Sequence, residues 1–369
     1  MKTTNELYDE RLKRIKAAVA LENPDRVPVV PLGDAFCAKT VGVKLADFCT
    51  KPELARDTMI KAYKLMGEVD GVQHVSFNVY LLSVIWLSKL KVPGIDLEEN
   101  ELWQVSEAEL MSNKDYDFII ENGYGAFIEK YYKEKLDDLE PKWSPFTASL
   151  PAAINSWKEL GIVPFSPAAV TIPYELFCGG RSFTAFLKDL YRMPDKVHAA
   201  MEASMPYILE STRQLARGLN PIGLWVGGWR SASEFLSPKL WQRFIFPFYK
   251  EIVQTVIDEG VVPILHFDSD WTRDLEYFKE FPRAKCVLSL DGSTDIYKAK
   301  EVLGDHMCLM GDVPPSMLTL AKPDDVYAYC QRLIRDIGPN GFILAQGCDI
   351  PPDAKLENVQ AMISAAIGK

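Results

Sequence analysis

Short apolar runs recur along the chain, each bounded by turn residues and followed by a segment with a helical spacing of apolar positions. Runs rich in β-branched and aliphatic residues with such boundaries predict β-strands. The predicted strands are Val27–Pro31, Gly71–Phe77, Ile162–Phe165, Ile222–Val226, Val261–Phe267, Cys286–Leu290, Met307–Met310 and Gly341–Ala345. Amphipathic helices are predicted between the last five strands, at Ser237–Asp258, Trp271–Phe281, Asp295–Leu303 and Pro323–Ile337.

This alternation of strands and helices predicts the fold class. Near-continuous apolar strands separated by amphipathic helices are typical of a parallel sheet that is covered by helices. Eight such strands favour a closed barrel over an open sheet. We therefore expect an α/β protein with a single (β/α)8 TIM-barrel domain over residues 1–369, because no segment has the composition of a linker.

Two segments are expected to extend the barrel. Residues Met1–Leu21 carry acidic side chains and an amphipathic helical pattern, which predicts an N-terminal helical extension and not a secretion signal. Residues 87–160 are acidic, with a helical pattern around Asp115–Leu136. Because a connection of this length usually forms a lid or a wall of a site, we expect an insertion at about 87–160.

The composition excludes several classes of protein. The 369 residues include 41 Lys and Arg against 51 Asp and Glu, a net charge of −10, and a nucleic-acid partner would require a basic surface. The longest strongly apolar run, Val79–Trp86, is far shorter than the roughly 20 residues that span a membrane. The seven cysteines are scattered without a CxxC spacing, which is typical of reduced thiols in a cytoplasmic protein.

In parallel α/β barrels the chemistry comes from residues at the carboxyl ends of the strands. His266, Asp268 and Cys348 stand out among these residues, because imidazole, carboxylate and thiolate are the common zinc ligands. His266 and Asp268 lie two residues apart at the end of one predicted strand, so their side chains point to the same side. A catalytic zinc requires three protein ligands and one open position. All strand-end candidates together are Asp34, Asn78, Trp229, Arg230, His266, Asp268, Asp291, Asp312 and Cys348.

Structural alternatives stay open for these candidates. A histidine near a strand end is often hydrogen-bonded within the core, and a free cysteine is often a small buried apolar side chain. Asp291 and Asp312 could cap the helices that follow them. Aromatic residues around the strand ends offer flat walls for an aromatic ring or belong to the barrel core; they are Phe36, Phe77, Tyr80, Trp86, Phe177 and Trp229.

Five segments of the chain resemble the uroporphyrinogen decarboxylase superfamily, which also contains corrinoid-dependent methyltransferases. The segment GFILAQGCDIPPDAKLENVQAM (341–362) is similar to the last strand and the following helix entry of that superfamily. The others, in the same order as in the superfamily, are 20–31, 166–202, 233–253 and 310–326. The resemblance covers nearly the whole chain, is weakest over about 87–160, and implies a single (β/α)8 barrel.

Three departures separate the chain from the decarboxylases of this superfamily. Those enzymes are expected to carry an arginine-rich segment after the first strand, where this chain reads PLGDAFCAKTVG (31–42) without arginine. They carry an aspartate after the second strand, where this chain has Asn78, and Gly-His after the last strand, where it has Gly347 and Cys348. The resemblance therefore points to the methyltransferase branch, and within it to the methyltransferase component of O-demethylases.

The methyltransferases of this branch bind zinc through His-x-Cys on one strand and a cysteine after the last strand. His266 and Cys348 match two of these positions, and Asp268 occupies the third in place of cysteine. Carboxylate is an acceptable zinc ligand. The departure nevertheless puts the third ligand in doubt, and Asp312 or Glu234 are the alternatives.

The resemblance implies an enzyme that moves a methyl group between a small molecule and the cobalt of a corrinoid. Because the chain shows no corrinoid-carrier domain, we expect the corrinoid on a partner protein. A mixed nitrogen, oxygen and sulfur ligand set favours an oxygen substrate over a thiol, and the aromatic candidates favour an aryl methyl ether. The expected catalytic residues are Asp312, Arg230, Asn78 and Trp229, with Arg230 either binding a substrate carboxylate or phenolate or forming a surface salt bridge.

Three other functions stay open at this point. Methyl transfer can run in the opposite direction, from a methyl-corrinoid to a thiol such as coenzyme M. A uroporphyrinogen decarboxylase-like decarboxylase would need no metal. A barrel that only docks a corrinoid protein or a tetrapyrrole would show no turnover.

Overall fold

The computed structural model describes residues 2–368, so Met1 and Lys369, the ends of the predicted domain, lie outside the described residues. Strands β5 to β10 form a six-stranded parallel sheet in the order β10-β9-β8-β7-β6-β5 within this range, and β1 pairs in parallel with β4. Their bounds are β1 Gly71–Val72, β4 Val163–Pro164, β5 Ala169–Val170, β6 Gly223–Gly228, β7 Val262–Phe267, β8 Val287–Leu290, β9 Cys308–Val313 and β10 Phe342–Gln346.

Backbone hydrogen bonds join the two parallel sheets into a closed barrel. The segment 28–31 lies between β10 and β1, because Val30 N donates to Leu344 O at 3.0 Å and Asp70 N donates to Val29 O at 3.0 Å. On the other side, Gly223 N of β6 donates at 2.8 Å to Phe165 O, next to β4. The hydrogen-bonded circuit returns to its starting strand, and the predicted TIM-barrel fold is confirmed.

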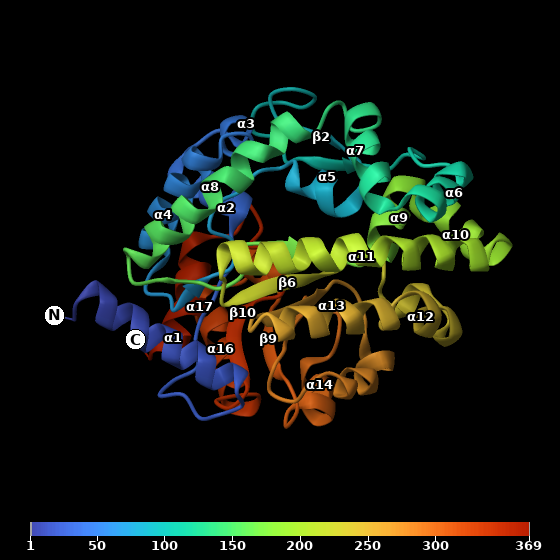
Figure 1. Ribbon diagram of the computed structural model, residues 1–369. Helices are drawn as coiled ribbons and strands as arrows, with labels where there is room; N and C mark the ends of the chain where they lie inside the picture. Colours follow the sequence, from blue (N-terminus) through green and yellow to red (C-terminus); the bar gives the residue numbers. More distant parts are fainter. Residues whose placement is uncertain (1, 369) are drawn as a thin grey trace.

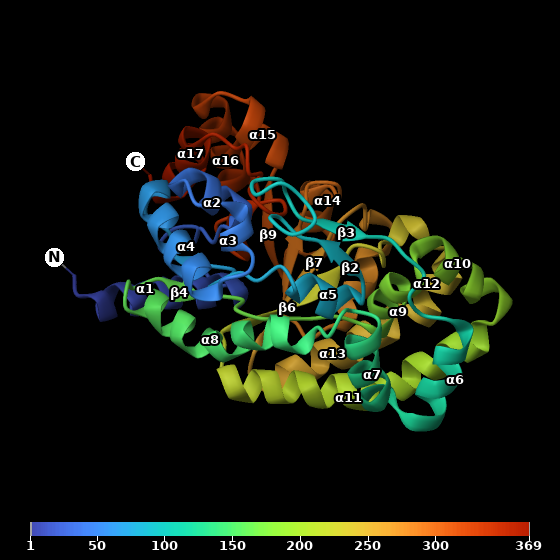
Figure 2. The same cartoon turned by 90° about the horizontal axis from the view of Figure 1, so that it is seen from above.

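Helices alternate with the strands and lie around the barrel (Figures 1 and 2). After the segment 28–31 come α2 Asp34–Val41, α3 Leu45–Phe48 and α4 Pro52–Met66, and α8 Glu140–Lys158 leads into β4. The later layers are α9 Pro173–Arg181, α10 Phe183–Arg192 and α11 Pro194–Leu219, then η1 Ser233–Phe235, α12 Pro238–Phe244 and α13 Phe246–Asp258. The last are η2 Thr272–Glu280, α14 Ile296–Leu303, α15 Pro315–Leu320, α16 Pro323–Asp336 and α17 Leu356–Ile367.

The helix α1, Thr4–Val19, is the predicted N-terminal extension. It begins with a capping box, in which the side chains of Thr3 and Glu6 bind each other's backbone N–H groups. Its buried face includes Ile15 and packs against side chains of the barrel interior. Arg11 donates at 2.7 Å to the carbonyl of Gly161, just before β4. The helix α1 therefore covers the amino-terminal end of the barrel and does not cover the carboxyl end, where the candidate site residues lie.

The expected insertion lies beside the barrel, as Figure 1 shows for α6 and α7 against α11. The helix α5, Leu81–Trp86, leads into it. It contains the antiparallel pair β2 Lys89–Lys91 and β3 Gln104–Ser106 and the helices α6 Asn113–Asn122 and α7 Tyr124–Glu134. The helix α8 packs against α4 as part of the helical layer. The insertion therefore ends before α8, and residues 140–158 belong to the barrel.

Four predicted elements differ from the observed ones. The strand expected at Val27–Pro31 is an isolated bridge between Val29 and Leu344. The strand expected at Gly71–Phe77 is reduced to β1, because the Gln73 side chain binds the carbonyl of Val30 at 3.0 Å and the chain then leaves the ladder. The helix expected at Ser237–Asp258 divides into α12 and α13, because Pro247 cannot donate a helical hydrogen bond to the preceding turn. The helix expected at Trp271–Phe281 is the 3₁₀ helix η2.

We predict that the fold depends on a buried ion-pair network at Asp70. This carboxylate is fully buried and accepts hydrogen bonds from Arg14, from Arg26 at 2.7 Å and from Val29 N at 2.9 Å. Asp70→Ala leaves two arginines without their shared partner and should lower the free energy of unfolding by about 3–5 kcal/mol. Urea denaturation measures this change.

The matched control is Asp353→Ala, because Asp353 is 72% exposed and pairs with Lys39 at the surface. It should cost less than about 1 kcal/mol. Equal losses of stability in the two variants would contradict the role given to the buried network.

Candidate metal centre

Three potential metal ligands meet at the carboxyl ends of the strands. His266 lies in β7, Asp268 follows it by two residues, and Cys348 follows β10. One donor atom from each residue lies within 4.8 Å of the other two, and His266 Nε2 is 3.4 Å from Asp268 Oδ1. Because β8 and β9 separate β7 from β10 in the sheet, these side chains meet across the mouth of the barrel.

The local backbone explains how His266 and Cys348 are positioned. Alternate residues of β7 face the barrel interior, and Ile264 belongs to the interior core, so His266 points to the same side. Gly347 precedes Cys348 and packs against Asp291: a Cβ atom at this position would lie 2.3 Å from the carbonyl oxygen of Asp291. Only glycine permits this close approach, which brings Cys348 toward the mouth of the barrel.

The ionisable groups of this trio depend on one another. Burial disfavours the charged imidazole of His266, but Asp268 and Cys348 outweigh it and raise its pKa to about 10. Burial alone would raise the pKa of Asp268, yet His266 holds it below its usual value. Burial raises the pKa of the Cys348 thiol. These shifts show that Asp268 and Cys348 favour a positive charge on His266, and both side chains bind metals in their deprotonated forms.

The donor set fits a zinc ion. Nitrogen, oxygen and sulfur donors all bind zinc, and His266 Nδ1 lies 3.3 Å from Ser289 Oγ, so Nε2 is the nitrogen turned toward Asp268. A hydrogen bond to the second ring nitrogen is the usual support of a metal-binding histidine. The trio is therefore chemically and geometrically competent to hold a metal.

The two alternative third ligands lie elsewhere. Glu234 is exposed, and its Oε1 is 3.5 Å from the backbone N of Asp270. Asp312 lies within β9, and its Oδ1 accepts a hydrogen bond from Tyr329 of α16 at 3.2 Å. Among the described residues, neither shares the group of donor atoms formed around His266.

Asn78 is buried at a turn. Its Oδ1 accepts from Tyr80 N at 2.9 Å, and its Nδ2 donates to the carbonyl of Lys142 at 3.4 Å. These contacts account for its burial, and the catalytic role expected for Asn78 stays a prediction.

Arg230 is fully buried, and its ion-pair partner Glu107 is exposed. Its guanidinium stacks 4.0 Å from the centre of the Trp229 ring, and one of its nitrogens lies 3.6 Å from Glu107 Oε2. Within residues 2–368 its three side-chain nitrogens have no hydrogen-bond partner. Glu175 Oε1 fixes the backbone by accepting from Arg230 N and Ser231 N at 2.9 and 2.7 Å.

The aromatic candidates separate into two groups. Trp86 and Trp229 are half-buried and lie edge to face, with ring centres 6.4 Å apart. Phe177 is fully buried against Tyr116 and Tyr124 of the insertion and is core. Phe36 and Phe77 are also buried, whereas Tyr80 is half-buried like the two tryptophans.

Two relevant residues escaped the sequence analysis. The Trp225 ring centre lies 5.9 Å from that of His266. Trp225 lies on β6 two residues before Gly227, the residue that pairs with His266, and this spacing could have indicated the contact. His74 lies 2.9 Å from Asp34 at the same end of the barrel. Its signal was hidden, because the predicted strand Gly71–Phe77 placed His74 in mid-strand.

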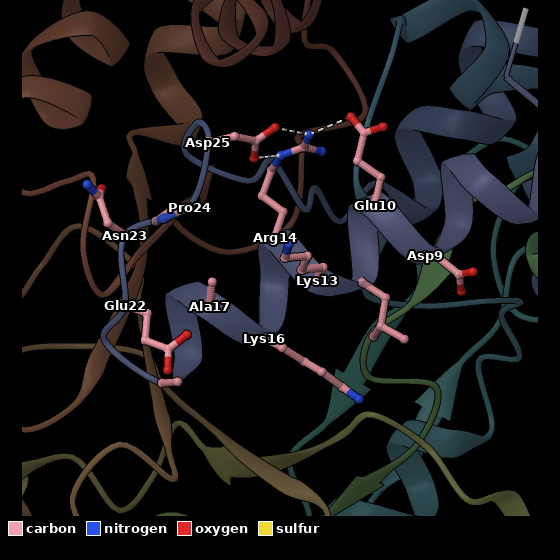
Figure 3. Close-up of a pocket in the computed structure, with 12 residues that line it drawn as sticks. Asp9, Glu10, Lys13, Arg14, Lys16, Ala17, Glu22, Asn23, Pro24 and Asp25 are labelled. Carbon is pink, nitrogen blue, oxygen red and sulfur yellow. Dashed lines mark hydrogen bonds and ion pairs between the residues drawn. The ribbon is translucent and has the colours of Figure 1, made fainter.

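A hollow of about 680 Å³ lies beside α1 and the loop that follows it (Figure 3). Arg14 is held there by Glu10 at 2.9 Å and by Asp25 at 2.7 Å. Because α1 covers the amino-terminal end of the barrel, this hollow is separate from the trio at the carboxyl end.

The fold and the trio define a class of protein, a TIM barrel with a metal-type donor cluster at the carboxyl ends of its strands. A family model described as uroporphyrinogen decarboxylase (URO-D) matches residues 121–368. The chain belongs to this family.

Curated relatives agree with this assignment, and a solved structure shares the fold. Uroporphyrinogen decarboxylases of Chlorobium phaeobacteroides and Chlorobium luteolum are 24% and 29% identical over 330 and 326 residues, each match covering 85% of this chain and 84% of the relative. A methyltransferase from Methanosarcina mazei superposes with a TM-score of 0.74 at 18% identity, covering 100% of this chain and 99% of its own, and so has the same fold. In the described range, no helix combines the length and apolarity needed to cross a bilayer.

We predict that His266→Ala and Cys348→Ala each abolish stable zinc binding, because two ligands remain where three are required. Ser289→Ala should weaken zinc affinity by about 10–100-fold through loss of the support to His266 Nδ1. Elemental analysis and competition with a chelator measure both effects. Cys330→Ala, at a buried cysteine of α16, is the control. Full zinc content in either ligand variant would refute the assignment.

We predict that Asp312 makes the fold less stable as the pH rises. Burial raises its pKa to about 7 in the folded protein, although Tyr329 opposes this. Because the folded pKa lies above the unfolded value of about 3.9, the contribution to stability is full below about pH 4 and is lost as the pH rises through 7. Asp312→Asn should remove this loss, at most about 4 kcal/mol.

Urea denaturation at pH 5 and pH 8 tests this sign. The native chain should lose more stability between these two pH values than Asp312→Asn does. Identical losses would show that Asp312 is not the buried group responsible.

Proposed function

We propose that the chain is a zinc-dependent methyltransferase that transfers a methyl group from an aryl methyl ether to the cobalt of a corrinoid. The observation that carries the proposal is the convergence of His266, Asp268 and Cys348 within 4.8 Å at the barrel mouth. A decarboxylase of this family would need no metal centre. The fold shared with a methyltransferase from Methanosarcina mazei is compatible with the proposal.

His266, Asp268 and Cys348 would hold the zinc ion and leave a fourth position open. Bound zinc would supply Lewis acidity, which stabilises negative charge as it develops on the oxygen that loses the methyl group. One thiolate with one carboxylate leaves the ion harder than two thiolates do, and this ligand set suits an ether oxygen better than a thiol.

The surroundings of the trio support an aromatic donor. Trp225 of β6 lies beside the His266 ring, and the half-buried Trp229 directly follows β6. Gly227 pairs with His266 across β6 and β7, and Arg230 lies three residues further along the chain, just after the end of β6. A methoxybenzoate with its ether at the trio would direct its carboxylate to Arg230.

The segment 31–42 also favours this proposal over decarboxylation. It contributes Asp34, which pairs with His74, and no cationic side chain for the carboxylates of a porphyrinogen beyond Lys39. Lys39 instead pairs with Asp353 at the surface. We propose a cytoplasmic enzyme with a corrinoid-carrying partner protein, built as one domain with Asp312, Arg230, Asn78 and Trp229 contributing to the site.

The test is a methyl-transfer assay with free cob(I)alamin as the acceptor and a methoxybenzoate as the donor. The zinc-loaded protein should consume the cobalt(I) absorbance, form methylcobalamin and release the phenol in equal amounts. His266→Ala should abolish the reaction because it lacks a metal ligand. Anisole, which lacks the carboxylate, should be a poorer donor than the methoxybenzoate.

The family relatives define the competing outcome, because they are named decarboxylases. Uroporphyrinogen is therefore assayed in parallel with zinc-loaded and metal-free protein. Decarboxylation by the metal-free protein, with no methylcobalamin from any ether, would refute the proposed function.

A further inference from the structure

His74 and Asp34 form a second pair of ionisable side chains at the carboxyl end of the barrel. His74 follows β1, and Asp34 is the first residue of α2. His74 Nδ1 lies 2.9 Å from Asp34 Oδ2. Asp34 is 4% exposed, whereas the His74 side chain is 26% exposed. A buried carboxylate thus holds a histidine that still reaches solvent.

Hydrogen bonds tie this pair to the loop that carries Cys348. Asp34 N donates to Asp349 Oδ1 at 3.1 Å, next to Cys348, and Ile350 N donates to Leu32 O at 3.0 Å. The pair therefore lies beside the trio and not in a separate part of the molecule.

The pair is arranged so that His74 presents an N–H group. Its Nδ1 is engaged by Asp34, and within residues 2–368 its Nε2 has no protein partner. Burial lowers the pKa of His74, but Asp34 outweighs it and raises the pKa above the usual value. With Nδ1 donating to Asp34, the second N–H of the protonated ring is on Nε2.

The other titratable groups around the pair do not compete for this role. Burial raises the pKa values of Cys37 and Tyr63 far above neutral, so both stay protonated. Asp349 is half-buried, and desolvation and Asp34 raise its pKa. His74 combines a buried carboxylate partner with contact with solvent.

We propose that His74 is the proton donor of the methyl transfer and that Asp34 is its positioning residue. This rests on the proposed function. The methyl–oxygen bond breaks, the electron pair of cobalt(I) forms the new cobalt–carbon bond, and the pair of the broken bond stays on oxygen. The proton on His74 Nε2 moves to that oxygen, which leaves a neutral phenol and a neutral imidazole that takes its next proton from solvent.

The phenolate leaving group explains why a proton donor would speed the reaction. A phenolate whose parent pKa is about 10 is a strong base and departs reluctantly. Proton transfer in the transition state removes that charge and contributes about 10²–10⁴-fold to a rate. The contribution falls as the phenol becomes more acidic, because an acidic phenolate departs without help.

The test compares His74→Gln with the native chain on a series of methoxyarenes that differ in the acidity of the phenol released. With a methoxybenzoate, kcat should fall about 100-fold or more. With a nitro-substituted anisole, whose phenol is far more acidic, the loss should be less than about 10-fold. His198→Gln, at a half-buried histidine of α11 with the same 26% exposure, is the matched control and should leave both rates unchanged.

Two measurements separate this role from a structural or ligand role. The zinc content of His74→Gln should equal that of the native chain, and imidazole added to His74→Ala should restore part of the lost rate. In ¹⁵N NMR titrations, Asp34→Asn should lower the pKa of His74, and the same variant should show the leaving-group dependence of His74→Gln in weaker form.

Three results would overturn the proposal. Equal slowing of all donors by His74→Gln would show a structural role, and loss of zinc would make His74 a ligand. An unchanged rate with the methoxybenzoate would remove His74 from the reaction. These three results can be obtained only if the native chain transfers methyl groups. Inactivity of the native chain with every ether would refute the proposed function instead.

Discussion

Closure of the barrel is the constraint on which the site depends. Segment 28–31 hydrogen-bonds to β10 on one side and to the start of β1 on the other, so strands from the two ends of the chain become neighbours. His266 and Cys348 then reach the same point although β8 and β9 separate their strands. In an open sheet of the same strands these two side chains would lie about 14 Å apart, three times the spacing of neighbouring strands.

The amino-terminal end of the barrel stabilises the fold, and the carboxyl end contains the candidate site. At the amino-terminal end, α1 packs on the interior core, and Asp70 binds two arginines and the backbone of Val29. This end is held by satisfied hydrogen bonds. At the carboxyl end, His266 and Asp268 have mutually shifted pKa values, and Arg230 is buried without a hydrogen-bond partner among the described residues. Buried groups of this kind are typical of functional sites.

The sequence pattern was sufficient to predict the barrel, the N-terminal helix and the trio, because strand alternation fixes which residues reach the barrel mouth. It was not sufficient for features that depend on distant contacts. Phe177 belongs to the core because the insertion packs on it, and β1 is short because Gln73 binds the neighbouring segment. His74 escaped notice for the same reason: only the true end of β1 places it at the mouth, beside Asp34.

Family membership and the proposed chemistry answer different questions. The chain belongs to the uroporphyrinogen decarboxylase family, whereas the trio gives this member a donor set for a metal. The most direct measurement is X-ray absorption at the zinc edge of the zinc-loaded protein. The account predicts one sulfur ligand at about 2.3 Å with nitrogen and oxygen ligands at about 2.0–2.2 Å. A zinc site without sulfur, or with two or more sulfur ligands, would contradict it.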